Sequence, residues 1–317
     1  MDQAFTHKTN AEEVLLKSWQ RTGDDTFTVI AQWPRTHRFY TSRNGLHDPL
    51  LLTETIRQTL PLLSHSAYGV PFGHQLMWHD FAFDIRPEAT YDDGDPADVA
   101  LHITCSDVTY RRKHASAVTL SVEVERAGRQ LATARSRFTI QDRAVYNRLR
   151  GPYADIAAAN ARALPLPPPA AMTPFGRDRF EDVALASTDR PRRWQLRTDT
   201  AHPIFFDHLV DHTPGMLLLE AARQAALATA YPAPVTVTGM DSVFSRYAEL
   251  DVPCWVTAEP LTDSGSSEHG SPPKPFADRV RITAEQNDRE IFSSLVTLAP
   301  IPAQAPVSAA APTHTAR

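Results

Sequence analysis

One stretch of this chain occurs twice, and the repeat limits the folds that the sequence can adopt. Residues 47–58 (HDPLLLTETIRQ) and residues 212–224 (HTPGMLLLEAARQ) share an apolar pattern and the same order of polar residues. Apolar residues that recur at helical spacing predict a helix at each place. Such a repeat is typical of a fold built from two copies of one supersecondary unit. The polar residues that recur in register are Glu54, Arg57 and Gln58 in the first copy and Glu220, Arg223 and Gln224 in the second.

Strand-like segments, rich in β-branched and aromatic residues, follow each helix, and one more precedes the first helix. Two pairs of these segments read as hairpins, with turns at Ala127 and Gly128 and at Asn287 and Asp288. The sequence therefore predicts an α+β fold with two long central helices, each wrapped by an antiparallel sheet, and with the two sheets joined edge to edge. The segments are residues 25–34, 74–85, 98–111 and 116–140 in the first half, and 234–247, 252–261 and 278–300 in the second.

Proline and alanine mark the expected domain boundaries. Residues 151–176 include the run ALPLPPPAAMTP, which is typical of a semi-rigid linker. We therefore expect an N-terminal domain at residues 1–150 and a C-terminal domain at residues 177–300. The tail, residues 301–317, is rich in Pro, Ala and Thr and is expected to be disordered, and residues 264–275 are expected to form a flexible loop.

The composition excludes several classes of function. The net charge of −5 is spread without long blocks of like charge, which gives no reason to expect nucleic-acid binding. The N-terminus does not resemble a signal peptide, and no apolar run approaches the roughly 20 residues of a membrane span. Two isolated cysteines, Cys105 and Cys254, indicate buried thiols and neither a disulfide framework nor a metal cluster. We expect a cytoplasmic protein that needs no metal or other cofactor.

The second helix is almost entirely apolar or small, so its polar residues are informative. Glu220 and Arg223 lie three residues apart and share one face of the helix. A structural ion pair is one interpretation, but the recurrence of the pair in the first helix favours a function. Burial is expected to raise the pKa of Glu220 and so to suit it as a general base. Pro214 and Gly215 predict a tight turn whose following amides, those of Gly215 and Met216, can stabilise an oxyanion.

Three motifs together resemble the AfsA family. Residues 211–224 (DHTPGMLLLEAARQ) resemble its second-half motif, residues 47–58 its first-half motif, and residues 246–255 (RYAELDVPCW) a third family stretch. The resemblance extends from about residue 7 to about residue 299. It implies two hotdog domains and an acyltransferase that moves a β-ketoacyl group from an acyl carrier protein to dihydroxyacetone phosphate. Condensation then gives a butenolide phosphate, a precursor of γ-butyrolactone-class signalling molecules.

The resemblance also implies roles for particular residues. Glu54, Glu220 and Arg223 are the catalytic candidates. Arg223 or Arg57 is expected to bind the phosphate, because a guanidinium can pair with two oxygens at once. The remaining candidates for substrate binding are Gly215, Met216, Gln58, Gln224 and His212.

Other functions stay open at this point. The helix after a Pro-Gly turn is also similar to that of β-hydroxyacyl-carrier-protein dehydratases, which pair the helix glutamate with a loop histidine. His208 and His212 precede Glu220 by 12 and 8 residues, whereas the dehydratase histidine lies two residues further away than His208. A hotdog thioesterase is a related alternative. A non-catalytic module that binds an acyl chain or a lactone is another, although no helix-turn-helix segment provides an output.

Overall fold

The computed structural model describes residues 1–261 and 276–302 and contains one antiparallel sheet of twelve strands. Their order is β1-β2-β4-β5-β6-β3-β9-β12-β11-β10-β8-β7, so the second half repeats the first in reverse order. The strands of the first half are β1 (Leu16–Gly23), β2 (Thr26–Trp33), β3 (Gln75–Ile85), β4 (Ala97–Arg111), β5 (His114–Arg126) and β6 (Arg129–Gln141). Those of the second half are β7 (Leu185–Ser187), β8 (Arg193–Leu196), β9 (Val235–Phe244), β10 (Trp255–Leu261), β11 (Arg279–Gln286) and β12 (Arg289–Pro300).

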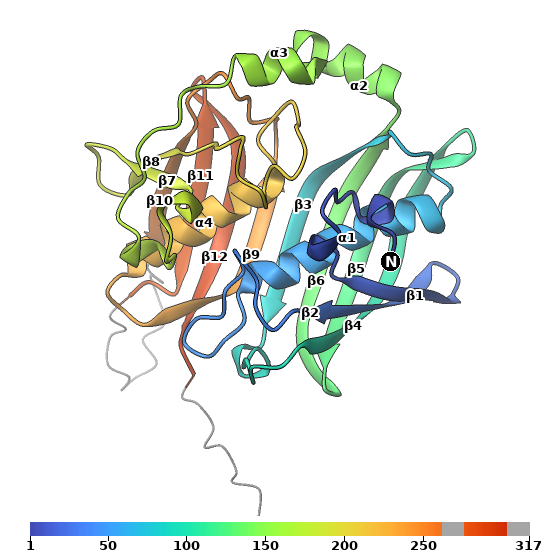
Figure 1. Ribbon diagram of the computed structural model, residues 1–317, viewed down its shortest axis with the longest axis horizontal. Helices are drawn as coiled ribbons and strands as arrows, with labels where there is room; N and C mark the ends of the chain where they lie inside the picture. Colours follow the sequence, from blue (N-terminus) through green and yellow to red (C-terminus); the bar gives the residue numbers. More distant parts are fainter. Residues whose placement is uncertain (262–275, 303–317) are drawn as a thin grey trace, which may run out of the picture.

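The two halves meet where β3 pairs with β9. Asp80 lies opposite Val243 and Asp84 opposite Gly239, so backbone hydrogen bonds continue across the boundary. The expected edge-to-edge joining of the sheets is therefore confirmed, as is the duplication that the repeat predicts. Figure 1 shows the two sheets as one curved surface, with β3 and β9 side by side at its centre.

The strands form where the sequence alternates between apolar and polar residues. Along β2 every second residue is buried, and the same alternation runs through most of β4. Successive side chains of a strand point to opposite faces of a sheet, so one face of each strand enters the core. Both predicted hairpin turns are confirmed: Ala127, Gly128, Asn287 and Asp288 all have positive φ, as two-residue hairpin turns require.

The two long helices lie on the same face of the sheet (Figure 1). Helix α1 (Pro49–Ser66) begins with Asp48 as its N-cap and a proline in its first turn. Helix α4 (Gly215–Ala230) is buried along most of its length, as its apolar sequence predicts. Each helix fills the space above the sheet of its own half.

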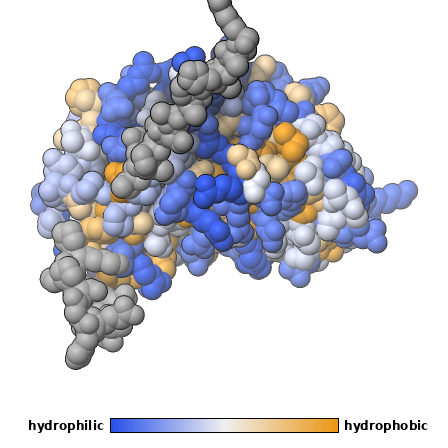
Figure 2. Space-filling view, turned by 90° about the horizontal axis from the view of Figure 1, so that it is seen from below, coloured by the Kyte–Doolittle hydropathy of each residue, from blue (hydrophilic) through white to orange (hydrophobic). Residues whose placement is uncertain are grey.

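The segment between the halves is partly helical. It forms α2 (Arg143–Arg150) and α3 (Ile156–Ala161), which run across one end of the molecule in Figure 1. The expected flexible loop at residues 264–275 and residues 303–317 of the expected tail lie outside the described residues. Within the described part of the chain, no helix has the length and apolar character that a membrane crossing needs. Hydrophilic residues cover most of the face in Figure 2, and hydrophobic ones occur there in small groups.

Candidate active site

A cavity of about 760 Å³ lies between the two halves. The first half contributes one face of α1, including Glu54 and Arg57, and the start of the chain, including Lys8. The second half contributes the beginning of α4, with Gly215 and Met216. Helix α1 therefore faces the N-terminus of α4 across this space. The other polar residues of the lining include His7, Thr9, His74, His79, Tyr146, Asp207, His208, His212, Arg246 and Tyr247.

On the side of the first half, Glu54 is surrounded by donors. Arg57 donates from Nε and Nη2 to the two carboxylate oxygens, at 2.8 Å each. Gln58 donates to Oε1 at 2.9 Å, and Lys8 Nζ lies 3.0 Å from the same oxygen. Burial acts to raise the pKa of Glu54, but the charges of Arg57 and Lys8 outweigh it and hold that pKa well below its usual range.

Glu54 therefore remains ionised and orients two cations. The side chain of Arg57 is 23% exposed, whereas that of Glu54 is 2% exposed. Among the described residues, Nη1 of Arg57 has no partner, so this end of the guanidinium can meet a bound anion. A guanidinium that is held by a carboxylate in this way is well suited to a phosphate group.

On the opposite side, the N-terminus of α4 is not capped by a side chain. The residue before the helix is Pro214, which makes no side-chain capping hydrogen bond. The first amides of a helix have no acceptor within the helix, so those of Gly215 and Met216 can receive an oxygen atom of a ligand. A Cβ at Gly215 would lie 2.9 Å from a ring carbon of Trp78 and 3.2 Å from one of Phe244. Glycine thus lets these two aromatic rings pack at the start of the helix.

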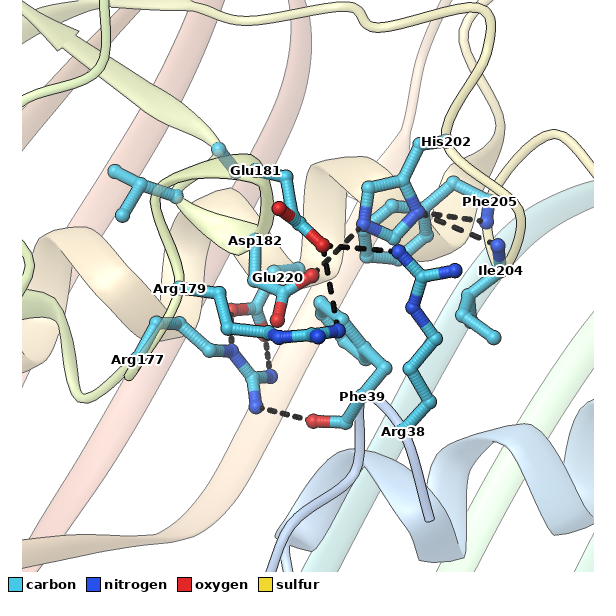
Figure 3. Close-up of polar contacts among 12 residues, drawn as sticks. Arg38, Phe39, Arg177, Arg179, Glu181, Asp182, His202, Ile204, Phe205 and Glu220 are labelled. Carbon is cyan, nitrogen blue, oxygen red and sulfur yellow. Dashed lines mark hydrogen bonds and ion pairs between the residues drawn. The ribbon is translucent and has the colours of Figure 1, made fainter.

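The equivalent place in the second half is closed. Arg223 donates from Nε and Nη2 to Glu220 at 2.8 and 2.7 Å, as Arg57 does to Glu54. Arg177 takes the place of Lys8, but it forms two further hydrogen bonds to Glu220, at 2.7 and 2.8 Å (Figure 3). Glu220 is fully buried and does not line the cavity.

Arg177 also reaches the N-terminus of α1. Its Nη1 donates to Asp48 at 2.9 Å and to the backbone oxygen of Phe39 at 2.8 Å, and the guanidinium lies over the Phe39 ring. Asp48 in turn caps α1 by accepting from the Leu50 amide at 2.8 Å. One arginine therefore fills the space between Glu220 and α1 that is open between Glu54 and α4.

The predicted pKa of Glu220 is wrong. Burial does act to raise it, but the positive charges of Arg177 and Arg223 outweigh burial and lower the pKa from 4.5 to about 2. The prediction considered one cation on the same helix and did not include a second from another segment. A carboxylate with such a low pKa is a poor base near neutral pH.

The other predicted site residues are divided between the cavity and the core. His212 lines the cavity together with Glu54, Arg57, Gly215 and Met216. Arg223 is 4% exposed and does not line it. Its Nη2 also donates to the backbone of Phe175. The expected binding of phosphate by Arg223 therefore does not fit this structure.

Gln58 and Gln224 differ from the prediction in the same way. Each side-chain amide bridges the backbone on both sides of a turn: Gln58 donates to Glu13 and accepts from Leu15, whereas Gln224 donates to Asp182 and accepts from Ala184. Both glutamines are fully buried and lie outside the cavity lining. They hold the segment before the first strand of each half against the helix and have no atoms left for a substrate.

Lys8 and Arg177 were not predicted, although the sequence contains a signal for them. Residues 8–16 (KTNAEEVLL) and residues 177–185 (RDRFEDVAL) form a second repeat, with a cation at the first position of each. The two cations pair with Glu54 and Glu220 from 46 and 43 residues away in the sequence. This repeat is short and lies far from the helices in the sequence, so it stands out less than the repeat of residues 47–58 and 212–224.

Comparisons with known proteins agree with this architecture. A family model described as the A-factor biosynthesis hotdog domain matches residues 1–142 and 158–302. The chain is 43% identical to a 2-oxo-3-(phosphooxy)propyl 3-oxoalkanoate synthase of Streptomyces virginiae, over 92% of this chain and 95% of that protein. It is 35% identical to a protein of the same name from Streptomyces griseus, over 92% and 93% of the two chains.

Solved structures with the same fold include an acyl-ACP thioesterase from Bacteroides thetaiotaomicron, with a TM-score of 0.52 and 12% identity over 86% of this chain and 98% of that one. A 12:0-ACP thioesterase from Umbellularia californica has the same TM-score at 7% identity, over 86% and 97%. These likenesses concern the fold alone, and they agree with the predicted double hotdog. The match over nearly the whole chain and the two Streptomyces relatives lead to one conclusion: the chain belongs to the A-factor biosynthesis hotdog domain family, also called AfsA.

Proposed function

We propose that this protein is a 2-oxo-3-(phosphooxy)propyl 3-oxoalkanoate synthase. It transfers a 3-oxoacyl group from a thioester on an acyl carrier protein to the hydroxyl of dihydroxyacetone phosphate. The names of the Streptomyces relatives support this reaction, because they describe the ester that the transfer forms. The observation in the structure that carries the proposal is the cavity, in which an uncapped helix N-terminus faces an arginine and a lysine from the other half.

The thioester end of the reaction fits the start of α4. The hydroxyl oxygen of the acceptor attacks the thioester carbonyl carbon, and negative charge develops on the carbonyl oxygen. The amides of Gly215 and Met216 donate to that oxygen, and the positive end of the helix dipole adds to the stabilisation. The C–S bond then breaks, the ester is released, and the proton of the hydroxyl passes to the thiolate.

The phosphate end fits the side of α1. Arg57 and Lys8 supply the positive charge, and Glu54 holds both in place. We assign Glu54 to positioning, because its oxygens already accept from Arg57, Lys8 and Gln58. In this assignment Glu220 and Arg223 belong to the cluster that Arg177 closes, and they act through stability.

The ester has an acidic methylene group between two carbonyl groups. A bond from this carbon to the ketone carbon of the phosphooxypropyl group closes a five-membered ring, and loss of one water gives a butenolide phosphate. Every atom of the ring comes from the ester, so this condensation needs no further reactant. The product has the skeleton of γ-butyrolactone-class signalling molecules.

Mass spectrometry of the products tests the proposed function. The purified protein is incubated with a 3-oxoacyl acyl carrier protein, with and without dihydroxyacetone phosphate. We expect the ester and its butenolide phosphate only when the acceptor is present, together with the free thiol of the carrier. Formation of free 3-oxo acid at the same rate without the acceptor would instead identify a thioesterase. A 3-hydroxyacyl acyl carrier protein is incubated in parallel. Loss of water from this substrate, without ester formation from the 3-oxoacyl substrate, would identify a dehydratase.

A further inference from the structure

A histidine of the cavity is paired with a buried carboxylate next to it in the sequence. Nδ1 of His212 lies 2.7 Å from Oδ1 of Asp211, and the His212 side chain is 28% exposed whereas that of Asp211 is 5% exposed. A carboxylate beside Nδ1 favours the tautomer in which Nδ1 carries the proton. Nε2 is then an acceptor, and it has no partner among the described residues. Because His212 lines the cavity, this nitrogen is available to a substrate.

Asp211 is held by the segment that connects the two halves. The hydroxyl of Tyr146 lies 2.8 Å from both oxygens of its carboxylate, and Arg150 donates from Nε at 3.0 Å. Both residues belong to α2. Burial acts to raise the pKa of Asp211, but hydrogen bonds from His212, Tyr146 and Arg150 hold it well below its usual range. The Asp211 carboxylate is therefore ionised near neutral pH.

Arg150 is itself fixed from the second half. It donates from Nη2 to Glu249 at 2.8 Å, and its guanidinium lies 4.0 Å from the ring centre of Tyr247. The rings of Tyr247 and His212 pack in a T-shaped contact, with a centroid distance of 4.8 Å. The histidine thus has a carboxylate on one side and an aromatic ring on another. These two contacts hold the imidazole with its Nδ1 towards the Asp211 carboxylate.

We propose that His212 is the general base of the acyl transfer and that Asp211, Tyr146 and Arg150 are its positioning residues. The inference rests on the function proposed above and names the group that moves the proton. Nε2 of His212 takes the proton of the acceptor hydroxyl while the oxygen bonds to the thioester carbon. The imidazolium then gives this proton to the thiolate as the C–S bond breaks. Asp211 stabilises the imidazolium between the two steps.

The other candidate bases, Glu54, Glu220 and His208, suit this role less well. Glu54 and Glu220 are surrounded by cations, which lower their proton affinity. His208 also lines the cavity and also pairs with a carboxylate, that of Asp207. Its side chain is 48% exposed, and Asp207 is held through the backbone amide of Thr9 and not by a second side chain. His208 is therefore the matched comparison for His212.

The first experiment measures kcat and KM for ester formation in single variants. His212→Ala is expected to lower kcat by about 10²–10⁴-fold, with little change in KM for dihydroxyacetone phosphate. Free imidazole in the buffer is expected to restore part of the rate, because it fits the space of the missing ring. Imidazole cannot rescue a variant that has only lost stability. His208→Ala is expected to lose far less.

Variants of the positioning residues follow the same logic. Asp211→Asn keeps the shape but no longer stabilises an imidazolium, so kcat is expected to fall by about 10²-fold or more. Tyr146→Phe keeps the ring and removes one hydrogen bond to Asp211, for an expected loss of about tenfold in kcat. Tyr153→Phe is the control, because its ring packs against Arg150 and no hydrogen bond joins its hydroxyl to Asp211 among the described residues. This control is expected to match the wild type.

Nitrogen-15 NMR separates the inference from the proposed function. The signals of His212 are assigned by their absence in His212→Ala, and they are expected to show the Nδ1–H tautomer in the wild type and its loss in Asp211→Asn. If the wild type forms no ester, the proposed function fails, and the tautomer still tests the pairing. A normal kcat in His212→Ala, or a larger loss in His208→Ala, overturns the inference while acyl transfer stands. An Nε2–H tautomer in the wild type also overturns it.

Discussion

Glu54 and Glu220 occupy equivalent positions in the two helices, and the cation opposite each one decides what it can do. Lys8 offers a single ammonium to Glu54, and this leaves the neighbouring space open. Arg177 offers a planar fork to Glu220 and a third nitrogen to Asp48. A guanidinium makes several directed hydrogen bonds at once, which an ammonium on a flexible stem does not. The change from lysine to arginine thus accompanies the difference between the open cluster around Glu54 and the closed cluster around Glu220.

Arg57→Lys tests the phosphate contact at this scale. Lysine keeps the charge but loses the fork, and a lost charge-assisted hydrogen bond corresponds to about 1.5–3 kcal/mol. We expect KM for dihydroxyacetone phosphate to rise by about 10–100-fold. With dihydroxyacetone, which lacks the phosphate, the variant and the wild type are expected to behave alike. Equal losses with both acceptors would show that Arg57 does not bind the phosphate.

Arg223→Lys is the matched variant in the closed cluster. Because Arg223 is buried against Glu220 and the backbone of Phe175, its replacement is expected to lower the free energy of unfolding. KM for dihydroxyacetone phosphate is expected to stay within about twofold of the wild type. Urea unfolding and steady-state kinetics on the same preparation give both values. A rise in KM for dihydroxyacetone phosphate without loss of stability would show that Arg223 binds the phosphate.

Glu220→Gln tests the closed cluster through pH. The variant leaves Arg223 buried without a counter-charge and leaves Arg177 with Asp48 alone, so we expect a loss of about 3–5 kcal/mol of stability at pH 7. The folded-state pKa of Glu220, about 2, lies below the ordinary 4.5. Its ionised form therefore stabilises the wild type fully above about pH 4.5, and this contribution is lost as the pH falls towards 2.

Urea unfolding between pH 7 and pH 3 measures this difference. The gap in stability between wild type and Glu220→Gln is expected to narrow as the pH falls below 4.5. Glu123→Gln, at an exposed position of β5, is the control, and its gap is expected to be small at every pH. A constant gap across the range would mean that the Glu220 carboxylate is not held in its ionised form.

At the scale of elements, the start of α4 depends on a residue without a side chain. In Gly215→Ala the new Cβ would come within 2.9 Å of Trp78, so the ring or the helix terminus has to move. Because Gly215 and Met216 line the cavity and their amides are the proposed oxyanion donors, we expect kcat to fall while KM for dihydroxyacetone phosphate changes little. The phosphate contacts of Arg57 lie on the other side of the cavity and provide the internal control. An unchanged kcat would show that the amides of Gly215 and Met216 do not stabilise the oxyanion.

The elements differ in how well the sequence predicts them. The long helices and the two hairpins follow from periodicity and turn residues, which act locally. Strand β1 was missed because it lies at an edge of the sheet: only one of its residues is buried, so it lacks a clear alternation. Within the site, Arg57 and Gly215 line the cavity, and their roles in substrate binding stay predictions. The closure at Glu220 was not predicted, because it depends on Arg177, which only the folded chain brings to the helix.

For the whole molecule, the pairing of β3 with β9 makes the two halves one structural unit. A separated half would expose this edge to solvent and to other chains. It would also leave Asp48 and Arg177, which pair across the boundary, without each other. We expect a fragment of residues 1–165, expressed alone, to aggregate or to remain unfolded, and activity to return when residues 166–317 are co-expressed with it. Size-exclusion chromatography and circular dichroism test this, and a stably folded monomeric fragment would contradict it.

The closed arginine cluster also bears on how such a chain can change over time. In a symmetric dimer of identical subunits, every substitution occurs at two places, so a residue that closes one site closes both. Two units on a single polypeptide are free of this constraint. The cluster around Glu220 can accumulate contacts that strengthen the fold, while the cavity between α1 and the start of α4 keeps an uncapped helix N-terminus and incompletely paired cations, which lower stability. Covalent fusion thus separates robustness from adaptability, and new acyl chains or acceptors can be accommodated in the open cavity without loss of the support that the closed cluster provides.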